Sequence, residues 1–423
     1  MRIRKSSLVI LMIYIYICYW LLYLPFVQLQ MAITGRVFIG SSYIMAIEVA
    51  LLIVILIIQL IKVIEFSKKQ SIILFFIVFM SFTCVRGVLE YRLPVYEIGL
   101  FLFNKFFPLL FVSLIYLNRD YMNVKGIEKI VRKVAWINIV MMLIQYFTGS
   151  IIWPYQLDQN GNQFFWSLNT YGLVSNTLRF PGIMTSGMAS GFLSIVLFCI
   201  LLSDRCQENI KRIFCLNTLK ICICAFSIVI TLTRNAYVGF IYVLVYVFTM
   251  NKIGKAKDRN FIGIIITLIS VVTYFIALVI ASLTKTSTGI LNFTSSTIRI
   301  GIWRDLMKQF ISLSAHEILG GAMRWQASSQ RSIFSDNVFI EELFSIGIIG
   351  LILYIGLIVL IQKNILYKKS IIFYPFAAMS TLILIIGVAN APTAMMEGVI
   401  FILTATKAFD FRLDRAAEEE DFS

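Results

Sequence analysis

Apolar stretches of about 20 residues recur along the whole chain and are separated by short charged breaks. A helix of this length crosses the roughly 30 Å hydrocarbon core of a bilayer, so each stretch is a candidate transmembrane helix. The stretches cover residues 7 to 27, 39 to 61, 71 to 86, 95 to 117, 134 to 153, 182 to 202, 215 to 232, 235 to 250, 261 to 283, 337 to 361, 371 to 390 and 394 to 408. The pattern predicts an all-α polytopic membrane protein, a single integral membrane domain over residues 1–423 with about 12 transmembrane helices.

The composition supports the same fold class. Of the 423 residues 59% are hydrophobic, and the mean hydropathy is +0.87. These values exclude an ordinary soluble domain, because too little polar surface remains to face water. The first stretch follows a short basic segment, but it is too long for a cleaved signal peptide and lacks a small-residue cleavage site. We therefore expect it to be a retained anchor.

The positive charges predict how the chain is oriented. Lys and Arg outnumber Asp and Glu by 37 to 22, which gives a formal net charge of +15. In a soluble protein this excess would suggest a nucleic-acid partner, but here the cations lie in the breaks and we expect none. Alternate breaks are richer in Lys and Arg, so the positive-inside rule predicts cytoplasmic N- and C-termini, with the tail 409–423 inside. The segment 284–336, between the ninth and tenth stretches, is then a long extracytoplasmic loop.

Metal and disulfide chemistry have no support in the sequence. The seven cysteines form no CxxC pair, and the single histidine, His316, has no partner at metal-ligand spacing. No Asp-x-Asp occurs, so the carboxylate pair that usually holds a metal-bound nucleotide sugar is missing. We therefore expect neither a metal nor a cofactor.

Arginines gather on the predicted extracytoplasmic side, where the orientation rule disfavours cations. They are Arg179, Arg234, Arg299, Arg304, Arg324 and Arg331. Any one of them can be a snorkelling or ion-paired side chain at the interface. Arg179 and Arg234 lie so close to apolar stretches that we expect them to face the bundle interior or a wet cavity. Because a guanidinium binds phosphate oxygens in bidentate fashion and stays charged, this set favours a pyrophosphate ligand, with Arg304 as a further contact.

The long loop contains a segment with helical periodicity. Its apolar positions are Ile298, Ile302, Leu306 and Phe310. The spacing predicts an amphipathic helix that begins after Ser295 or Ser296 and lies on the outer membrane surface, with Trp303 as an interfacial anchor. Arg299 and Arg304 lie on its other faces. A surface helix without chemistry is the alternative.

Polar side chains also mark the start of the tenth stretch. Asn337, Glu341 and Ser345 fall on one helical face, and we expect the first two, together with His316, to contact an acceptor. Asp336 precedes this face and is either a helix N-cap or a functional carboxylate.

Charged side chains also lie inside the fourth stretch. Glu97 and Lys105 are two turns apart on one face, which predicts a structural ion pair or, alternatively, a relay. In the tenth stretch, Gly347 and Gly350 are expected to be close-packing positions.

These residues favour a donor that is carried by the membrane itself. A glycan joined through pyrophosphate to a polyprenyl lipid would place its tail in the bilayer and its anionic head among the arginines. In glycosyl transfer, negative charge builds up on the leaving oxygen, and guanidinium groups stabilise that charge without a proton donor. Such a transferase needs at most one base for the acceptor hydroxyl.

Four segments, in this order and spacing, resemble signature segments of the bacterial O-antigen polymerase and O-antigen ligase superfamily. They are RFPGIMTSGMASGF, TLTRNAYVGF, STIRIGIWRDLMKQFISLSAHEILGGA and SDNVFIEELFSIGIIGLILYIG, all in roughly the C-terminal half. The resemblance implies a GT-C-like architecture in which Arg179, Arg234 and Arg299 hold the lipid pyrophosphate. Arg234 would also be catalytic, because it would stabilise the leaving group.

Two departures from the family pattern affect the expected activity. The glycine turn is altered at residues 320–322, and Asp336 stands where the ligases carry a His before Asn. Ligases are thought to use that His near the acceptor hydroxyl, so the pair Asp336 and Asn337 favours a polymerase. Asp336 is then the expected catalytic base or acceptor-orienting group, with Glu341 and Glu342 as alternatives.

We therefore expect a metal-independent, inverting glycosyltransferase of the bacterial plasma membrane that polymerises a capsule or a lipopolysaccharide O-antigen. It would move a growing glycan from undecaprenyl pyrophosphate onto an incoming lipid-linked repeat unit at the outer face, and a chain-length regulator protein is a further expected partner. An O-antigen ligase is the alternative within the superfamily. A lipid-linked oligosaccharide flippase or other transporter, for which the sequence lacks the expected internal repeats, and a non-catalytic scaffold are alternatives from other classes.

Overall fold

The computed structural model describes most of the chain. The described residues are 5–34, 50–57, 68–119, 124–153, 156–157, 163–164, 179–184, 186–207, 216–253, 258–283, 294–326, 328–368, 370–389 and 394–409. Most of the predicted stretch 39 to 61 lies outside these residues. The same holds for 284–293 of the long loop and for the tail beyond Phe409.

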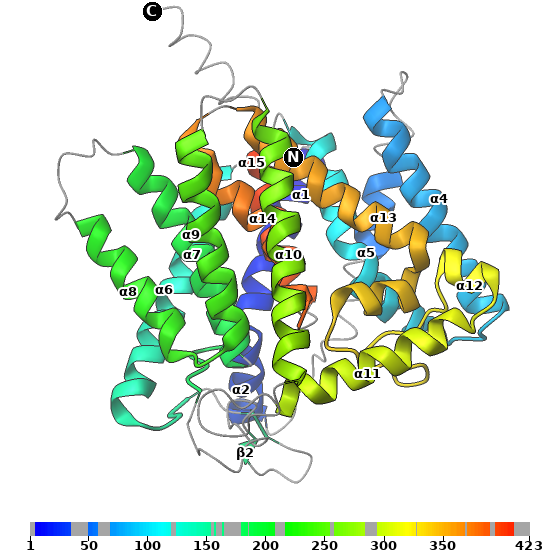
Figure 1. Cartoon of the computed structure of the whole chain (residues 1–423), viewed down its shortest axis with the longest axis horizontal. Coiled ribbons are helices and arrows are strands. Elements are labelled where there is room, and N and C mark those ends of the chain that lie inside the picture. The colour runs from blue at the N-terminus through cyan, green and yellow to red at the C-terminus, as the bar shows by residue number, and fades with distance from the viewer. Residues whose placement is uncertain are drawn as a thin grey trace, which may run out of the picture.

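Helices make up nearly all of the described structure (Figure 1). They are α1 (Lys5–Leu21), α2 (Tyr23–Thr34), α4 (Lys68–Leu89), α5 (Val95–Leu117), α6 (Val124–Thr148), α7 (Gly187–Gln207), α8 (Leu216–Ile230), α9 (Arg234–Ile253), α10 (Arg259–Leu283), α11 (Thr294–Ile311), α12 (Ala315–Gly320), α13 (Val338–Tyr367), the 3-10 helix η3 (Ile371–Phe373), α14 (Tyr374–Gly387) and α15 (Ala394–Ala408). Two short strands, β1 (Gln156–Leu157) and β2 (Gln163–Phe164), pair antiparallel.

Six helices in the described part of the chain are long and apolar enough to cross a membrane: α5, α6, α7, α9, α10 and α13. The bent pair Ile10–Tyr19 and Tyr23–Thr34, which meets at 69°, gives a seventh span if it counts as one. Shorter apolar helices lie within α4 and α8 and over 371–387. The chain is therefore a helical membrane protein, as the apolar pattern predicts.

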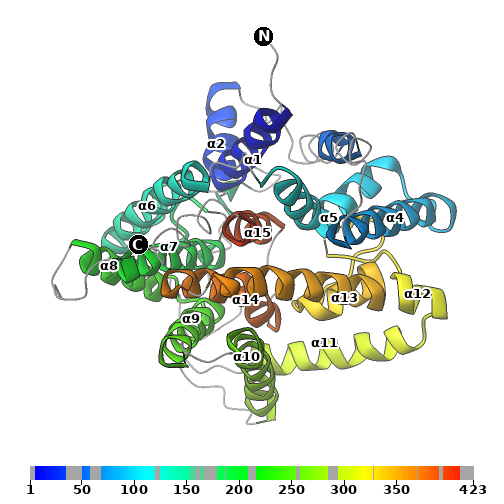
Figure 2. The ribbon, with the colours of Figure 1, turned by 90° about the horizontal axis from the view of Figure 1, so that it is seen from above.

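The centre of the bundle is α14, all 14 residues of which are buried. It packs against α7, α9, α13 and α15, and Figure 2 shows it between them. Pro375 is tolerated in its first turn because the N–H group there would have no partner within the helix. At its end, a Cβ on Gly387 would lie only 2.9 Å from the Cβ of Val338, so the absence of a side chain lets α13 approach. In contrast, few residues of α10 are buried, and many of its apolar side chains are exposed, as expected for a helix with one face toward lipid.

One end of the bundle is covered by α11, which crosses from α10 toward α12 at the lower right of Figure 1. The chain then packs α12 against α13 at a break in α13. Gly347, at the break, has a φ of 70°, and Gly321, at the end of α12, has a φ of 83°. A Cβ on Gly321 would lie 2.2 Å from the carbonyl oxygen of Ser345, and one on Gly347 would lie 2.4 Å from that of Leu319. Both glycines therefore permit direct backbone packing, as predicted for Gly347.

The amphipathic helix predicted in the long loop is α11, which starts at Thr294. Its buried face consists of Trp303, Leu306 and Phe310, which pack with residues of α13. Ile298, expected on the apolar face, is instead exposed. The predicted face is therefore confirmed at Leu306 and Phe310, and Ile302 packs partly buried against the same cluster.

Trp303 does not anchor the helix at a membrane interface, and that prediction was wrong. Its indole is only 4% exposed, and its Nε1–H donates to the carbonyl oxygen of Ser335 at 2.5 Å. Its ring also stacks on Phe275 of α10 at 6.2 Å between centroids. Trp303 instead ties α11 to α10 and to the residues just before α13.

Candidate functional site

Arg179 lies in a short irregular segment before α7, and two buried amide side chains of α6 fix this segment. Gln145 donates to the carbonyl oxygen of Gly182 at 3.0 Å and accepts from its N–H at 2.9 Å. The Oδ1 atom of Asn138 accepts from the N–H of Ile183 at 2.9 Å. Gly182 has a φ of 60°, and a Cβ there would lie 2.2 Å from Asn138 Oδ1, so glycine is required. These contacts hold the backbone that carries Arg179.

Arg234 is the first residue of α9 and directly follows a tight turn from α8. Leu232 in the turn has a φ of 51°, and the carbonyl oxygen of Thr233 accepts from the N–H of Ala236 at 3.0 Å. A helix N-terminus carries a partial positive charge and free N–H groups. The backbone and the exposed side chain of Arg234 therefore favour an anion at the same place.

Arg299 approaches from α11 and forms an ion pair with Asp336. Its Nε atom lies 3.3 Å from Oδ2 of Asp336. The Arg299 side chain is 28% exposed and that of Asp336 is 19% exposed, so the pair is partly shielded from water but remains accessible. It connects the long loop to the start of α13.

The fold brings Arg179, Arg234 and Arg299 into one group, here called the arginine cluster. Burial lowers the pKa of Arg179, and the positive charges of Arg234 and Arg299 lower it further. Arg234 and Arg299 also interact electrostatically with each other. Three like charges from separate elements therefore repel one another here, and an anion bound among them would offset that repulsion.

Asp336 has a strained backbone conformation, and its carboxyl group has a raised pKa. Its φ of 47° lies in the left-handed region, which Asp tolerates better than most residues with a Cβ. Burial raises the pKa of its carboxyl group, while the neighbouring Arg299 guanidinium opposes this shift. Its carboxylate is therefore more basic than that of an exposed aspartate.

The N-cap of α13 is Asn337, and the alternative interpretation of Asp336 as the cap was wrong. Asn337 Oδ1 accepts from the N–H of Ile340 at 3.1 Å, and its Nδ2 donates to the carbonyl oxygen of Val388 at 2.9 Å. The side chain that was expected to contact an acceptor is thus engaged in holding α13. Asp336 is left to face Arg299.

Tyr274 of α10 is a neighbour of the arginine cluster that the sequence did not reveal. Its hydroxyl donates to Oδ1 of Asn235 at 2.5 Å, and it interacts electrostatically with Arg234 and Arg299. It is the only tyrosine of α10, whose other hydroxyl side chains are those of serines and threonines, and this single phenol was the signal available. Tyr274 contributes a hydroxyl to the wall of the cluster.

Two of the proposed site residues lie apart from the cluster. The side chain of Arg304 is 69% exposed, and its Nε lies 3.4 Å from Oδ1 of Asp305. His316 is in α12, where its Nε2 lies 2.8 Å from Oε1 of Glu90. Because α11 rises about 18 Å between Arg299 and its end, His316 lies apart from Asp336. A contact between His316 and the acceptor stays a prediction.

Glu341 is engaged in a buried ion-pair group with Lys105 and Glu342. The Nζ atom of Lys105 lies 2.8 Å from an oxygen of each glutamate, and all three side chains are buried. The predicted pair of Glu97 with Lys105 was wrong, since Glu97 instead accepts from the hydroxyl of Ser328 at 3.0 Å. Glu341 and Glu342 are therefore poorly disposed to act as an alternative base or acceptor contact.

Among the residues that the structure describes, no three His, Cys, Asp or Glu side chains lie close enough to hold a metal ion together. The functional side chains at this end of the bundle are guanidinium groups, one carboxylate and a phenol. These groups suit an oxyanion ligand.

Comparison with known proteins adds no family. No protein-family model matches the sequence, and no curated protein matches it. The function of the chain therefore has to be inferred from its residues and their geometry.

Proposed function

We propose that this protein is a polysaccharide polymerase that transfers a growing glycan from a polyprenyl pyrophosphate carrier onto an incoming lipid-linked repeat unit. The observation that carries the proposal is the arginine cluster beside Asp336. Three guanidinium groups from separate elements converge there on one end of a membrane bundle. A pyrophosphate at the surface of a bilayer matches this charge and position.

In the proposed reaction, an acceptor hydroxyl oxygen attacks the anomeric carbon of the donor. The bond from that carbon to the pyrophosphate oxygen breaks, and its electron pair remains on the oxygen. Arg179, Arg234 and Arg299 stabilise the charge that develops on this leaving group. The hydroxyl proton passes to the carboxylate of Asp336, which burial makes more basic. Attack opposite the leaving group inverts the anomeric centre.

The number of membrane spans and their orientation are part of the same proposal. We propose about 12 spans in a GT-C-like arrangement: the six long helices, the bent pair, the shorter apolar helices α4, α8, α14 and α15, and the predicted stretch 39 to 61. Both termini would be cytoplasmic in a bacterial plasma membrane, and the arginine cluster would then face outward. The excess of Lys and Arg in alternate breaks supports this orientation.

An O-antigen ligase is the second candidate, since it would use the same donor and therefore the same arginines. The carboxylate at position 336, where the resembling ligases carry a histidine, favours the polymerase. The distance of His316 from the cluster supports the same choice, because this single histidine of the chain cannot substitute for the ligase residue.

The experiment is a reconstitution of purified protein in liposomes that contain only the lipid-linked repeat unit. A polymerase makes a ladder of longer lipid-linked products, whereas a ligase makes none until a second acceptor lipid is added. Substituting Arg234→Lys should reduce the ladder by about 100- to 1000-fold, as for the loss of one oxyanion-stabilising donor. The matched control is Lys308→Ala, which removes an exposed cation of α11. A full ladder from the Arg234→Lys protein would refute the proposed role.

A further inference from the structure

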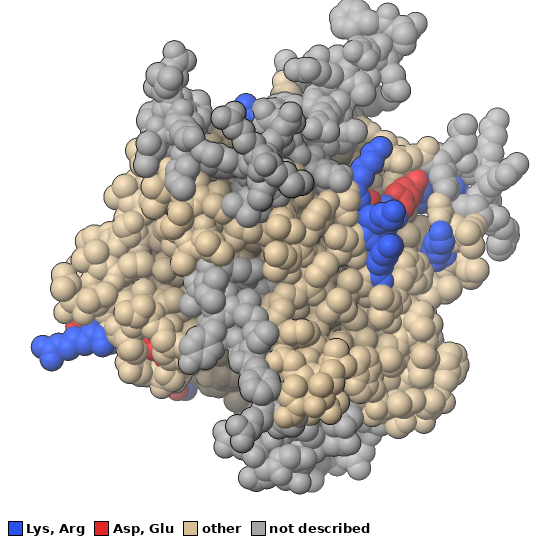
Figure 3. Space-filling model, turned by 180° about the vertical axis from the view of Figure 1, so that it is seen from behind, with Lys and Arg blue, Asp and Glu red and all other residues tan. Residues whose placement is uncertain are grey.

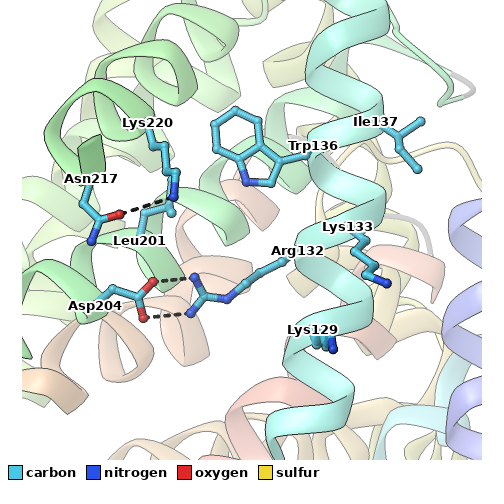
Figure 4. Close-up of a pocket in the computed structure, with 9 residues that line it drawn as sticks. All are labelled: Lys129, Arg132, Lys133, Trp136, Ile137, Leu201, Asp204, Asn217 and Lys220. Carbon is cyan, nitrogen blue, oxygen red and sulfur yellow. Dashed lines mark hydrogen bonds and ion pairs between the residues drawn. The ribbon is translucent and has the colours of Figure 1, made fainter. Parts of the chain in front are cut away.

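A second group of cations lines a cavity between α6, α7 and α8, far from the arginine cluster along the bundle. The cavity has a volume of about 480 Å³. Lys129, Lys133 and Lys220 line it, together with the ring of Trp136 (Figure 4). Figure 3 shows basic side chains gathered at the upper right, on the side where α6 lies, while most of the other described surface in that view is uncharged.

This cavity lies at the opposite end of the bundle from the arginine cluster. Lys129 and Lys133 are in the first turns of α6, and Lys220 is near the start of α8. Arg179 precedes α7, and Arg234 follows α8. Because consecutive helices run antiparallel, the beginnings of α6 and α8 share one end and the two arginines share the other. In the proposed orientation the cavity is on the cytoplasmic side.

The acidic side chains near the cavity are already engaged by other cations. Asp204 of α7 binds Arg132 in bidentate fashion, with one contact at 2.8 Å. Glu128 pairs with Arg132 and, at 2.7 Å, with Lys407 of α15. These pairs join α6 to α7 and α15, and Figure 4 shows Arg132 turned toward Asp204. The acids therefore serve to pack the helices together.

The three lysines differ from Arg132 in this respect. Within the described ranges, no carboxylate forms an ion pair with Lys129, Lys133 or Lys220, and Lys220 contacts only the amide oxygen of Asn217 at 3.5 Å. Lys129 and Lys133 lie on α6 and Lys220 lies on α8, and Figure 4 shows the Lys133 side chain turned away from Lys220. An anion that bridges the two helices would therefore require the flexible side chain of Lys133 to turn toward the cavity. Phosphate oxygens suit this arrangement of ammonium groups.

The apolar surface beside the cavity indicates that the anion belongs to a lipid. Ile137, which lines the cavity, is 53% exposed, and it is followed on the same face of α6 by Val140 (53%) and Ile144 (43%). This stripe runs from the cavity toward the C-terminal end of α6, within the predicted apolar stretch 134 to 153, where acyl chains would cover it. Trp136 has the amphipathic ring that is enriched at membrane interfaces.

We propose that this cavity binds the phosphodiester headgroup of an anionic phospholipid, with its acyl chains along the exposed stripe of α6. Lys129, Lys133 and Lys220 hold the phosphate. The bound lipid bridges α6 and α8 and stabilises this end of the bundle.

The test uses full-length protein in a neutral detergent, titrated with phosphatidylglycerol or with phosphatidylcholine and followed by native mass spectrometry. We expect phosphatidylglycerol to bind and phosphatidylcholine not to bind. The variant K129Q/K133Q/K220Q should weaken phosphatidylglycerol binding by about 100-fold, roughly fivefold for each lysine. A charge-matched control, K252Q/K363Q/K368Q, removes three lysines near the same end of the bundle from α9 and the end of α13 and should bind like the wild type. Wild-type affinity in the first variant would overturn the proposal.

Two further arms make the result specific. Inorganic phosphate at the same concentration should not displace the lipid, and equal competition would mean that the site takes a soluble anion instead. Brominated phosphatidylglycerol should quench tryptophan fluorescence in the wild type and lose most of that effect in Trp136→Phe. Unchanged quenching in that variant would place the lipid elsewhere. The K129R/K133R/K220R variant should retain binding, which keeps the test valid if the glutamine variant fails to fold.

Discussion

The Nε atom of Arg299 lies 3.3 Å from Oδ2 of Asp336, and this ion pair connects α11 to the residue that precedes α13 by two positions. One partner belongs to the arginine cluster and the other is the proposed base. The pair thus links two proposed functions: the guanidinium would hold the donor, and the carboxylate would accept the proton. It also means that changes at Arg299 alter the basicity of Asp336.

This coupling predicts a specific pH dependence. A base must be deprotonated, so the rate of polymerisation should rise with pH through the pKa of Asp336, which burial holds above its usual value near 3.8. The Arg299 guanidinium lowers that pKa, so Arg299→Gln should move the acidic limb to higher pH as well as reduce the rate. The pH profile of ladder formation measures both effects. If the acidic limb of the profile stays at the same pH in Arg299→Gln, the limb does not report the titration of Asp336. Asp336→Asn should abolish the limb together with nearly all activity.

The segment that carries Arg179 should be sensitive to a single methyl group. Gly182→Ala forces a residue with a Cβ into a φ of 60° and directs that Cβ to within 2.2 Å of Asn138 Oδ1. The positive φ alone costs about 1–2 kcal/mol, and relief of the contact would disturb the amide bonds from α6. We expect a lower apparent melting temperature in detergent and loss of most polymer.

The control for this substitution is Gly356→Ala on α13. Nothing lies within 4 Å of a Cβ built there, and the residue is in a helix, where Ala is preferred to Gly by about 1 kcal/mol. The protein should be unchanged or slightly more stable. If Gly182→Ala behaved like Gly356→Ala, the fixed geometry of the segment before α7 would not matter.

The buried group around Lys105 should be structural. Lys105→Met leaves Glu341 and Glu342 buried without their cation, which costs about 3–5 kcal/mol for buried pairs of this kind. Apparent thermal stability in detergent should therefore fall sharply. Glu97→Gln is the matched comparison, because it leaves the lysine pairs intact and keeps one of the two oxygens that accept from Ser328 and Ser329. Equal losses in the two variants would argue against the assigned partners of Lys105.

The attachment of α12 should weaken in acid. Although burial opposes the shift, hydrogen bonds from Arg86 and His316 lower the pKa of Glu90 to about 2 from a usual value near 4.5. A carboxyl group whose folded pKa is lowered stabilises the protein above its unfolded pKa and loses that contribution as the pH falls toward the folded value. Hydrogen exchange of α12 amides, corrected for intrinsic rates, should therefore accelerate between about pH 4.5 and pH 2. In Glu90→Gln the exchange should already be fast at neutral pH, and protection equal to the wild type would contradict the role of Glu90.

The sequence predicts the helices well where an apolar run is long and uninterrupted. The stretch 95 to 117 corresponds to α5 in both bounds, and 394 to 408 corresponds to α15. The grouping of Arg179, Arg234 and Arg299 on one side was also predicted, because all three lie in segments that the alternation of Lys and Arg assigns to the extracytoplasmic face. These features follow from hydropathy and loop polarity, which are local properties of the chain.

Other features depend on contacts between distant segments and could not be predicted this way. Lys105 finds its partners more than 230 residues along the chain, where Glu97 on its own helix had seemed the natural choice. The burial of Trp303 depends on the surface of α13, which no pattern within α11 reveals. The break of α13 at Gly347 depends on the backbone of α12 packing against it.

The most direct measurement compares the binding of a polyprenyl pyrophosphate with that of the monophosphate of the same lipid to purified protein. If the arginine cluster holds a diphosphate, the wild type should prefer the pyrophosphate by at least about tenfold. The triple variant Arg179→Gln, Arg234→Gln and Arg299→Gln should lose this preference, and Lys308→Gln should keep it. Equal affinity of the wild type for the two lipids, or an undiminished preference in the triple variant, would contradict the account.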